Sequence, residues 1–169
     1  MIKASGFRDL AQLFRLVPGF ITVAQRGGFP AVLYGVDDDF ARRMQVLVDG
    51  RSIYTPSFGG VEWGNLPLEI EDIERIEVIR GPNAATYGAN SFFGVINVVT
   101  RHAAQDPGAL VSVTKGDHQV EHGVARYSAT AGRLSYRLTA GYHQDGGFVT
   151  LRDTLRVKRV SMRADYQIS

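Results

Sequence analysis

The chain has 169 residues, of which 44% are hydrophobic and 21% are charged. These fractions are typical of one globular domain, or of one domain with part of another, and they exclude a disordered chain. The net charge of +2 is small, and no cluster of lysine and arginine with interleaved aromatic residues is present, so nothing indicates nucleic acid binding. The absence of cysteine excludes disulfides, thiolate metal sites and cysteine nucleophiles.

The N-terminal segment predicts a short amphipathic helix. Leu10, Leu13, Phe14 and Val17 have the spacing of one helical face, and Pro18-Gly19 ends the pattern. The segment contains no apolar core followed by small residues, so it shows no sign of a secretory signal. No apolar run in the chain reaches the roughly 18 residues of a membrane-spanning helix. Because the helical pattern begins almost at the first residue, we expect the chain to be a fragment that lacks an upstream segment.

Short strands and loops follow this helix. Residues 20–24 and 31–34 favour strands. Between residues 34 and 40 the chain carries Asp37-Asp38-Asp39, which lacks the alternating spacing, the glycine and the distal glutamate of an EF-hand calcium loop. We therefore interpret these aspartates as a solvated loop and expect no metal site there.

A hairpin and an aromatic loop come next. Met44 to Val48 predicts a buried strand, and Asp49-Gly50 predicts a tight turn into a second strand over residues 52–55. The glycine-rich stretch PSFGGVEWG then holds Phe58 and the only tryptophan, Trp63. Aromatic residues on such a loop are either ligand contacts or anchors that fix the loop, and the sequence leaves both interpretations open.

Four acidic or helix-starting residues precede the strand that is predicted over residues 73–79. Pro67 suits the first turn of a helix, and Glu69, Glu71 and Asp72 favour the positive N-terminal end of its dipole. We expect these acids to cap a short, exposed helical turn. Paired carboxylates can act as a general acid and base, but no histidine or nucleophile accompanies them, so catalysis is not expected.

Two strands joined by a helical turn complete the N-terminal part. Residues 73–79 predict a strand that Gly81-Pro82 ends, the sequence NAATYG predicts a helical turn that closes at Gly88, and Phe93 to Thr100 predicts a second apolar strand. Short helices that alternate with strands as far as Arg101 indicate a small domain with a mixed sheet.

After Arg101 the pattern changes to strict alternation of apolar and polar residues. Each alternating run has about the 9 to 11 residues that a tilted strand needs to cross a bilayer. The apolar members are Leu134, Tyr136, Leu138, Ala140 and Tyr142 in one run, Val160, Met162, Ala164, Tyr166 and Ile168 in a second, and Ala125, Tyr127, Ala129 and Ala131 in a third, less regular one.

The lengths of the connections between the strands bear on whether the strands belong to a transmembrane β-barrel or to a soluble β-sandwich. Residues 131–133 predict a tight turn, whereas residues 143–154 form a longer polar loop, and this contrast is typical of a transmembrane β-barrel. A soluble β-sandwich gives similar alternation, because its strands also bury one face. With residues 110–115 included, the sequence predicts about four strands, which are too few to close a barrel, since the smallest have about eight.

Several motifs in the N-terminal part resemble one known family. The stretches QVLVDGRSIY and LPLEIEDIERIEVIRGPNAATYGANSFFGVINVVTR resemble the plug domain of TonB-dependent outer-membrane receptors, and DLAQLFRLVPGFITV resembles the leucine-rich segment that precedes these motifs in the family. The resemblance covers residues 8–101 in the same order. It implies an α+β plug domain with a small mixed sheet and short helices over residues 1–104. Residues 105–169 then resemble the first four or so antiparallel strands of a truncated transmembrane β-barrel of about 22 strands.

The resemblance also implies a function. In this family the plug gates the barrel, and the receptor binds and imports a scarce ligand such as a siderophore-iron complex or cobalamin. The implied partners are a small metal chelate or similar ligand, the lipid of the Gram-negative outer membrane, and the TonB energy-transducing complex, which acts on an N-terminal box that this chain lacks. No cofactor is implied, and no nucleic acid is expected as a partner.

Two groups of residues are candidates for these roles. The resemblance places Arg75, Glu77 and Arg80 where a plug docks against the barrel wall. It places the ligand-facing apical loops at residues 25–30, 36–42 and 54–63, whose candidate ligand contacts are Asp39, Phe40, Tyr54, Phe58 and Trp63. Aromatic side chains can stack on a flat chelate or a cobalamin-like ligand.

One family motif and two other protein classes bear on this interpretation. Many plugs carry an Ile-Arg-Gly-Phe segment where this chain has residues 33–36, Leu-Tyr-Gly-Val.

A soluble periplasmic β-rich binding or signalling module is the alternative function. An enzyme is not expected, because the sequence contains no G-x-S-x-G, no P-loop and no H-E-x-x-H motif. Metal binding by His118 and His122 is not expected, because two histidines four residues apart do not converge on a strand as they would on a helix.

Overall fold

The computed structural model describes residues 2–24, 30–35, 40–57, 59–150 and 153–168. The described residues form two compact units. Unit 1 comprises the described residues up to Leu66 together with Ile70–Thr100, and unit 2 comprises Pro67–Glu69 together with the residues from Arg101 onward. Within the described ranges, no helix is both long enough and apolar enough to cross a membrane.

Unit 1 begins with short helical segments that bury one apolar face. A 3₁₀ turn, η1 (Lys3–Ser5), precedes α1 (Leu10–Leu13), which continues into the 3₁₀ turn η2 (Phe14–Leu16). Asp9 caps α1, because its carboxylate accepts a hydrogen bond from the Gln12 backbone N–H at 2.9 Å. Leu10, Leu13 and Phe14 are buried, as the sequence pattern predicted, whereas Val17, the fourth member of the predicted face, follows η2 and is half-buried.

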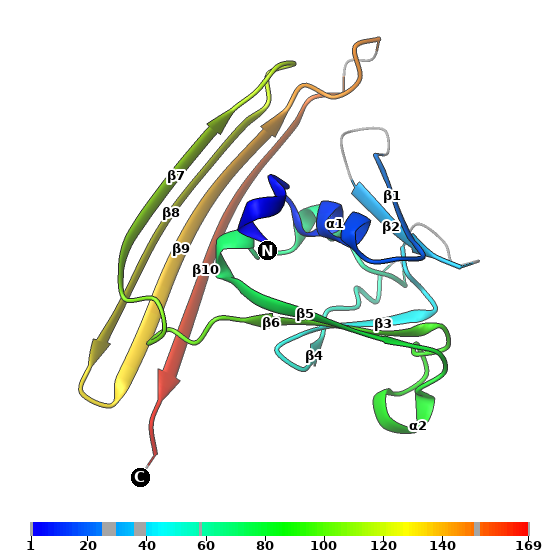
Figure 1. Ribbon diagram of the computed structural model, residues 1–169, viewed down its shortest axis with the longest axis horizontal. Helices are drawn as coiled ribbons and strands as arrows, with labels where there is room; N and C mark the ends of the chain where they lie inside the picture. The colour runs from blue at the N-terminus through cyan, green and yellow to red at the C-terminus, as the bar shows by residue number, and fades with distance from the viewer. Residues whose placement is uncertain (1, 25–29, 36–39, 58, 151–152, 169) are drawn as a thin grey trace. The chain divides into compact units, whose positions relative to one another are not determined.

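Two sheets form the rest of unit 1. Strands β1 (Phe20–Ala24) and β2 (Pro30–Tyr34) pair antiparallel in a sheet of their own. The main sheet has the strand order β4-β3-β6-β5, and it is mixed because β3 pairs parallel with β6 whereas β5 pairs antiparallel with it (Figure 1). The bounds of these strands are β3 Met44–Val48, β4 Arg51–Ser52, β5 Ile73–Arg80 and β6 Gly94–Thr100.

The Asp49-Gly50 turn joins β3 to β4 and also binds the central strand. Asp49 has a φ of 49° and Gly50 a φ of 75°, the left-handed pair that a tight hairpin turn requires. The Asp49 carboxylate accepts hydrogen bonds from the Thr100 backbone N–H at 2.8 Å and from its hydroxyl at 2.7 Å. One side chain therefore fixes the end of β6 beside the turn.

We expect the substitution Asp49→Ala to lower the free energy of unfolding of unit 1 by about 1–3 kcal/mol, because it removes the carboxylate that accepts two hydrogen bonds from Thr100. The control is Thr100→Val, which removes only the hydroxyl and should cost less. Hydrogen exchange at the amides of β6, measured in the purified protein, would report the difference. Equal protection in the two variants would contradict the expectation.

Two details of unit 1 differ from the sequence prediction. The second hairpin strand covers only Arg51–Ser52 and not residues 52–55. The turn after Pro67 is the 3₁₀ turn η4 (Ile70–Asp72). The prediction of exposed acids was wrong for Asp72 in this turn and for Glu69, which precedes the turn and belongs to unit 2, because both are buried. The helical turn in NAATYG is confirmed as α2 (Ala84–Tyr87). A further 3₁₀ turn, η3, covers Trp63–Asn65.

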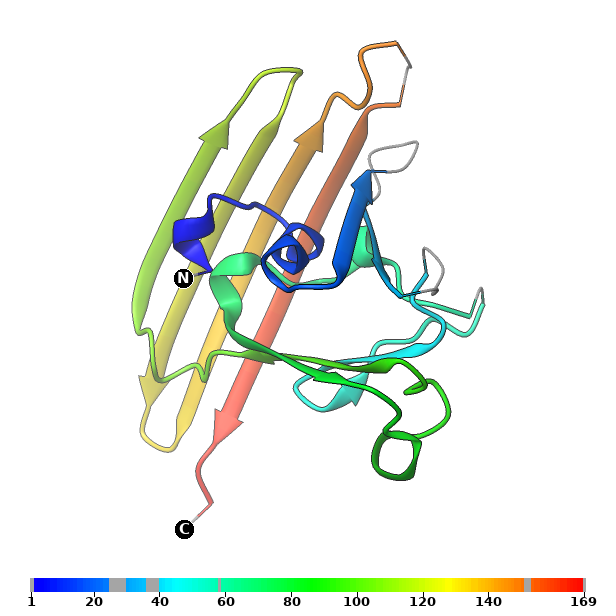
Figure 2. The same ribbon diagram turned by 45° about the vertical axis from the view of Figure 1, so that its right-hand side comes forward.

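Unit 2 contains one antiparallel sheet of four strands in sequence order. They are β7 (Gly108–Lys115), β8 (Glu121–Ala131), β9 (Leu134–Asp145) and β10 (Leu155–Tyr166). Figure 2 shows these strands side by side. The pairing is regular, with Tyr127 opposite Leu138 and Leu138 opposite Met162, so residues of one kind fall in rows across the sheet.

The burial of these strands is the reverse of that in a soluble protein. Met162 is 74% exposed and Val113 80%, whereas Arg137 is 6% exposed and Thr139 1%. The exposed large apolar side chains of these strands are Val111, Val113, Tyr127, Leu134, Leu138, Val160, Met162 and Tyr166. The buried polar ones are His122, Arg126, Ser128, Ser135, Arg137 and Thr139, and the apolar Val124 is buried as well. A soluble sandwich would bury the apolar face, whereas a transmembrane barrel exposes it to lipid.

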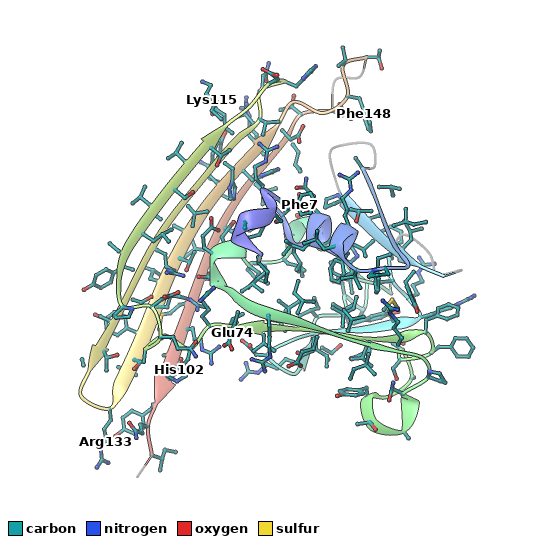
Figure 3. The ribbon with its side chains drawn as sticks, in the orientation of Figure 1. Phe7, Glu74, His102, Lys115, Arg133 and Phe148 are labelled. Atoms are coloured by element: carbon teal, nitrogen blue, oxygen red, sulfur yellow. The ribbon has the colours of Figure 1, made fainter. Side chains whose placement is uncertain are left out.

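The two ends of the sheet differ in their connections. Figure 3 shows Lys115 and Phe148 at one end of the strands and Arg133 at the other. The connection at Arg133 is a two-residue turn with Gly132 at a φ of 61°, whereas the link between β9 and β10 is a longer loop. The predicted contrast between a tight turn and a long loop is confirmed.

Candidate functional site

Two of the predicted ligand contacts lie beside one glycine pair in unit 1. The Val61 backbone N–H donates to the Phe40 carbonyl at 2.8 Å, and Thr55 and Gly60 form an isolated bridge that closes the loop between them. A Cβ atom added to Gly60 would overlap Phe40, and one added to Gly59 would lie 3.2 Å from the Tyr54 hydroxyl. The glycines therefore allow the two aromatic residues to approach the same loop.

Phe40 also has the exposure that a ligand contact needs. Its side chain is 36% exposed, and the guanidinium of Arg42 lies 5.4 Å from the centre of its ring. A cation over one face of the ring leaves this surface with aromatic and positively charged groups together. Such a surface can stack on a planar group and can attract an anion.

Trp63 has a different place from Phe40 and Tyr54. It is 4% exposed, and its ring packs edge-on against Phe14 at 5.2 Å. Phe14 contacts Phe20, which stacks on Tyr34 at 4.6 Å, so Trp63 ends a continuous aromatic cluster in the core. Of the two interpretations that the sequence left open, this geometry favours the anchor for Trp63. Asp39 and Phe58 lie outside the described residues.

The three predicted docking residues find partners inside unit 1. Arg75 donates to Glu74 at 2.9 Å and to Glu77 at 2.8 Å, and Asn97 donates to the other oxygen of Glu77 at 2.9 Å. Arg80 donates to the Pro18 carbonyl at 2.8 Å. Each of these side chains therefore has a hydrogen-bond partner within its own unit.

The ion pair of Arg75 and Glu77 perturbs the pKa of both groups. The hydrogen bond to Glu77 raises the pKa of Arg75, and the hydrogen bonds from Asn97 and Arg75 lower the pKa of Glu77. The contribution of Glu77 to stability is therefore present at neutral pH and is lost as the pH falls through its lowered pKa. Both groups are exposed, so water and salt screen the pair and its effect is small.

Unit 2 contains a buried polar cluster that the sequence reasoning missed. The carboxylate of Glu69 lies 3.1 Å from His122 Nε2 on β8 and accepts a hydrogen bond from Arg159 on β10 at 3.3 Å. Glu69 is 3% exposed and His122 4%. Because a carboxylate only accepts hydrogen bonds, the imidazole nitrogen is the donor. The described residues include no group of three or more acids, histidines or cysteines that could hold a metal ion.

Comparison with known protein families accounts for this combination of a mixed-sheet unit and four strands. Residues 1–95 match the model of the TonB-dependent receptor plug domain, which is more than half of the chain. The chain belongs to this family. The predicted α+β plug with a small mixed sheet, followed by antiparallel barrel strands, is therefore confirmed, and the family consists of transport receptors.

Two curated relatives illustrate the range of this plug family. The chain is 33% identical to the vitamin B12 transporter BtuB of Vibrio vulnificus over 152 residues, which cover 87% of this chain and 24% of that protein. It is 38% identical over 111 residues to the iron-regulated outer membrane virulence protein of Vibrio cholerae, with 62% of this chain and 16% of that protein covered. The chain therefore spans about a quarter or less of these relatives.

Solved structures of receptors show the same fold as this plug and its strands. The ferric yersiniabactin uptake receptor FyuA of Yersinia pestis superposes with a TM-score of 0.71 at 19% identity, over 98% of this chain and 27% of that one. The ferric citrate transporter FecA in its unliganded form gives a TM-score of 0.70 at 19% identity, over 95% of this chain and 26% of that one.

Proposed function

We propose that this chain is the plug and the first barrel strands of an outer-membrane receptor of a Gram-negative bacterium, in which the plug gates the import of a scarce ligand. One observation carries the proposal. Strands that follow a plug domain expose their apolar side chains and bury their polar ones, and this pattern suits lipid on one side and a polar lumen on the other. A periplasmic module would gain nothing from an exposed apolar face.

The ligand class that we propose is a metal chelate, either a ferric siderophore or cobalamin. The relatives include a vitamin B12 transporter and an iron-regulated outer membrane protein, which supports both members of the class. Phe40 and Tyr54 are the proposed contacts, together with the predicted residues Asp39 and Phe58. We leave Trp63 out, because its burial against Phe14 supports a core role.

The proposed partners follow from the same family membership. The energy for import would come from the TonB complex, and the barrel would lie in outer-membrane lipid. No enzymatic step is proposed, because family members are receptors for transport. Arg75, Glu77 and Arg80 stay candidates for docking, and the groups that now accept hydrogen bonds from the two arginines can exchange for acidic or polar groups of a barrel wall.

Uptake by the full-length receptor tests this function. A host strain without its own cobalamin and siderophore receptors would produce the receptor, and the accumulation of radiolabelled cyanocobalamin and of ferric yersiniabactin, ferric citrate and ferric enterobactin would be measured with and without TonB. We expect uptake of at least one probe that depends on TonB. Receptor that is present in the outer membrane but accumulates none of the four would contradict the proposal.

We expect Phe40→Ala and Tyr54→Ala each to weaken the binding of the imported probe about threefold to tenfold, the size of one lost aromatic contact of about 0.5–1.5 kcal/mol. Equilibrium binding to purified receptor provides the measurement. Tyr87→Ala is the matched control, because Tyr87 is also 36% exposed but lies on α2, outside the predicted apical loops. Unchanged affinity in both test variants would remove this surface from the ligand site.

A further inference from the structure

The chain is fixed to the four-stranded sheet at a short segment inside the plug sequence. Pro67–Glu69 belongs to unit 2, whereas Leu66 before it and Ile70 after it belong to unit 1. The chain joins unit 2 again at Arg101, whose carbonyl accepts a hydrogen bond from Arg137 on β9 at 2.7 Å. Residues 67–69 and Arg101 are therefore two points in the chain that belong to the same unit as the four-stranded sheet.

A glycine provides the space that the first of these points occupies. Gly141 lies on β9 opposite Val124 of β8 and Arg159 of β10. A Cβ atom added to Gly141 would overlap Oε1 of Glu69 and would lie 2.5 Å from its Cδ. The carboxylate thus rests against bare backbone in the middle of the sheet, and we call this space the Gly141 notch.

The notch places hydrogen-bond donors from both neighbouring strands at the carboxylate. His122 of β8 reaches one oxygen of Glu69, and Arg159 of β10 reaches the other. A buried carboxylate is unfavourable unless its charge is paired and its oxygens accept hydrogen bonds, and here both conditions are met. Loss of either donor would remove one of the two hydrogen bonds that stabilise the buried carboxylate.

We propose that Glu69 is a positioning residue that latches the plug in its closed state, with the Gly141 notch, His122 and Arg159 as the receiving site on the strands. While the carboxylate stays in the notch, Pro67–Glu69 stay fixed to the sheet, so opening requires its release. The gating role rests on the receptor function proposed above, whereas the attachment of the segment does not.

Hydrogen exchange in the purified full-length receptor tests the attachment without any ligand. We expect Glu69→Ala, Glu69→Gln and Gly141→Ala each to speed exchange at the amides of residues 68–71 by about tenfold or more, since hydrogen bonds to a charged group are lost. Gly123→Ala is the matched control: Gly123 also lies within a strand without a positive φ, and an added Cβ would meet nothing within 4 Å. It should leave these amides unchanged.

A double-mutant cycle separates the notch from a general effect on β9. If the side chain of Glu69 occupies the notch, Gly141→Ala displaces that side chain when Glu69 is present. In the Glu69→Ala background, the same substitution has no side chain to displace. The two effects on exchange should therefore be strongly non-additive. Additive effects would mean that Gly141 matters for another reason, and this result would overturn the proposal.

Passive permeability tests the gating role in cells that produce each receptor. We expect the Glu69 variants and Gly141→Ala to admit severalfold more vancomycin than the wild type without TonB, while uptake of the imported probe still depends on TonB. Faster exchange at residues 68–71 with unchanged permeability would overturn the latch. If the wild type imports no probe, the receptor function fails, but the exchange experiment still decides the attachment.

Discussion

We expect Gly94→Ala to disrupt the plug sheet and to lower the free energy of unfolding of unit 1 by about 3 kcal/mol or more, at the upper end of the range for overpacking. A Cβ atom at Gly94 would lie 2.5 Å from the carbonyl oxygen of Ile79, and real Cβ contacts are not that short. The obstacle is backbone, so no rotation of a side chain can relieve the overlap. The affected pair, β5 and β6, is the longest in the plug sheet.

The measurement for Gly94→Ala is hydrogen exchange at the amides of β5 and β6 in the purified receptor, together with the yield in the outer membrane. Gly94 has no positive φ, so the backbone itself accepts alanine and any loss is due to the contact. Gly123→Ala is the same substitution at a site where the added Cβ would have no neighbour within 4 Å, so this variant should keep the wild-type rate of amide exchange. Unaltered exchange in Gly94→Ala would mean that the pairing of β5 with β6 is looser than described.

Local patterns predicted most of the fold, because they depend on neighbouring residues. The i, i+3, i+4 spacing of Leu10, Leu13 and Phe14 predicted their burial on one helical face. The Asp49-Gly50 turn was predictable because few residue pairs accept two left-handed conformations. Alternation likewise predicted the strands of unit 2, and the resemblance to plug domains supplied the order in which the elements assemble.

The role of Glu69 could not be predicted from local sequence. Its partners are 53 and 90 residues away, and no short motif links positions at that distance. The dipole rule placed the acids at an exposed helix start, but tertiary burial overrides such local preferences. One signal was present: His122 and Arg159 lie on the polar face of alternating strands, and a buried arginine there requires an acidic partner.

The position of Trp63 illustrates the same limit at a loop. Glycine-rich sequence around an aromatic residue is compatible with a ligand surface and with a core anchor, and only the contact with Phe14 distinguishes them. Tyr34 is a related case. Many plugs carry arginine at this position, but here the ring stacks on Phe20, so the side chain supports the aromatic cluster of unit 1.

We expect Met162→Arg to reduce the amount of folded receptor in the outer membrane severely. Near the bilayer midplane, arginine on the lipid-facing side of a barrel lowers the free energy of unfolding by about 2–4 kcal/mol. Met162 is 74% exposed and lies in a row with Leu138 and Tyr127 on the apolar face. In water, a charge at so exposed a position usually changes stability by no more than about 0.5 kcal/mol. Met162→Arg is therefore expected to be strongly destabilising in a barrel and nearly neutral in a soluble module.

Two control variants make this result specific to lipid exposure. Thr154→Arg introduces the same charge just before β10, in the loop, where the penalty for arginine falls to about 0–1 kcal/mol. Met162→Leu keeps the face apolar and should behave as the wild type in either environment. Folded receptor would be measured in the outer-membrane fraction and by urea unfolding in lipid vesicles. If Met162→Arg and Thr154→Arg were equally well tolerated, the apolar face would not contact lipid, and the periplasmic module would become the better account of these strands.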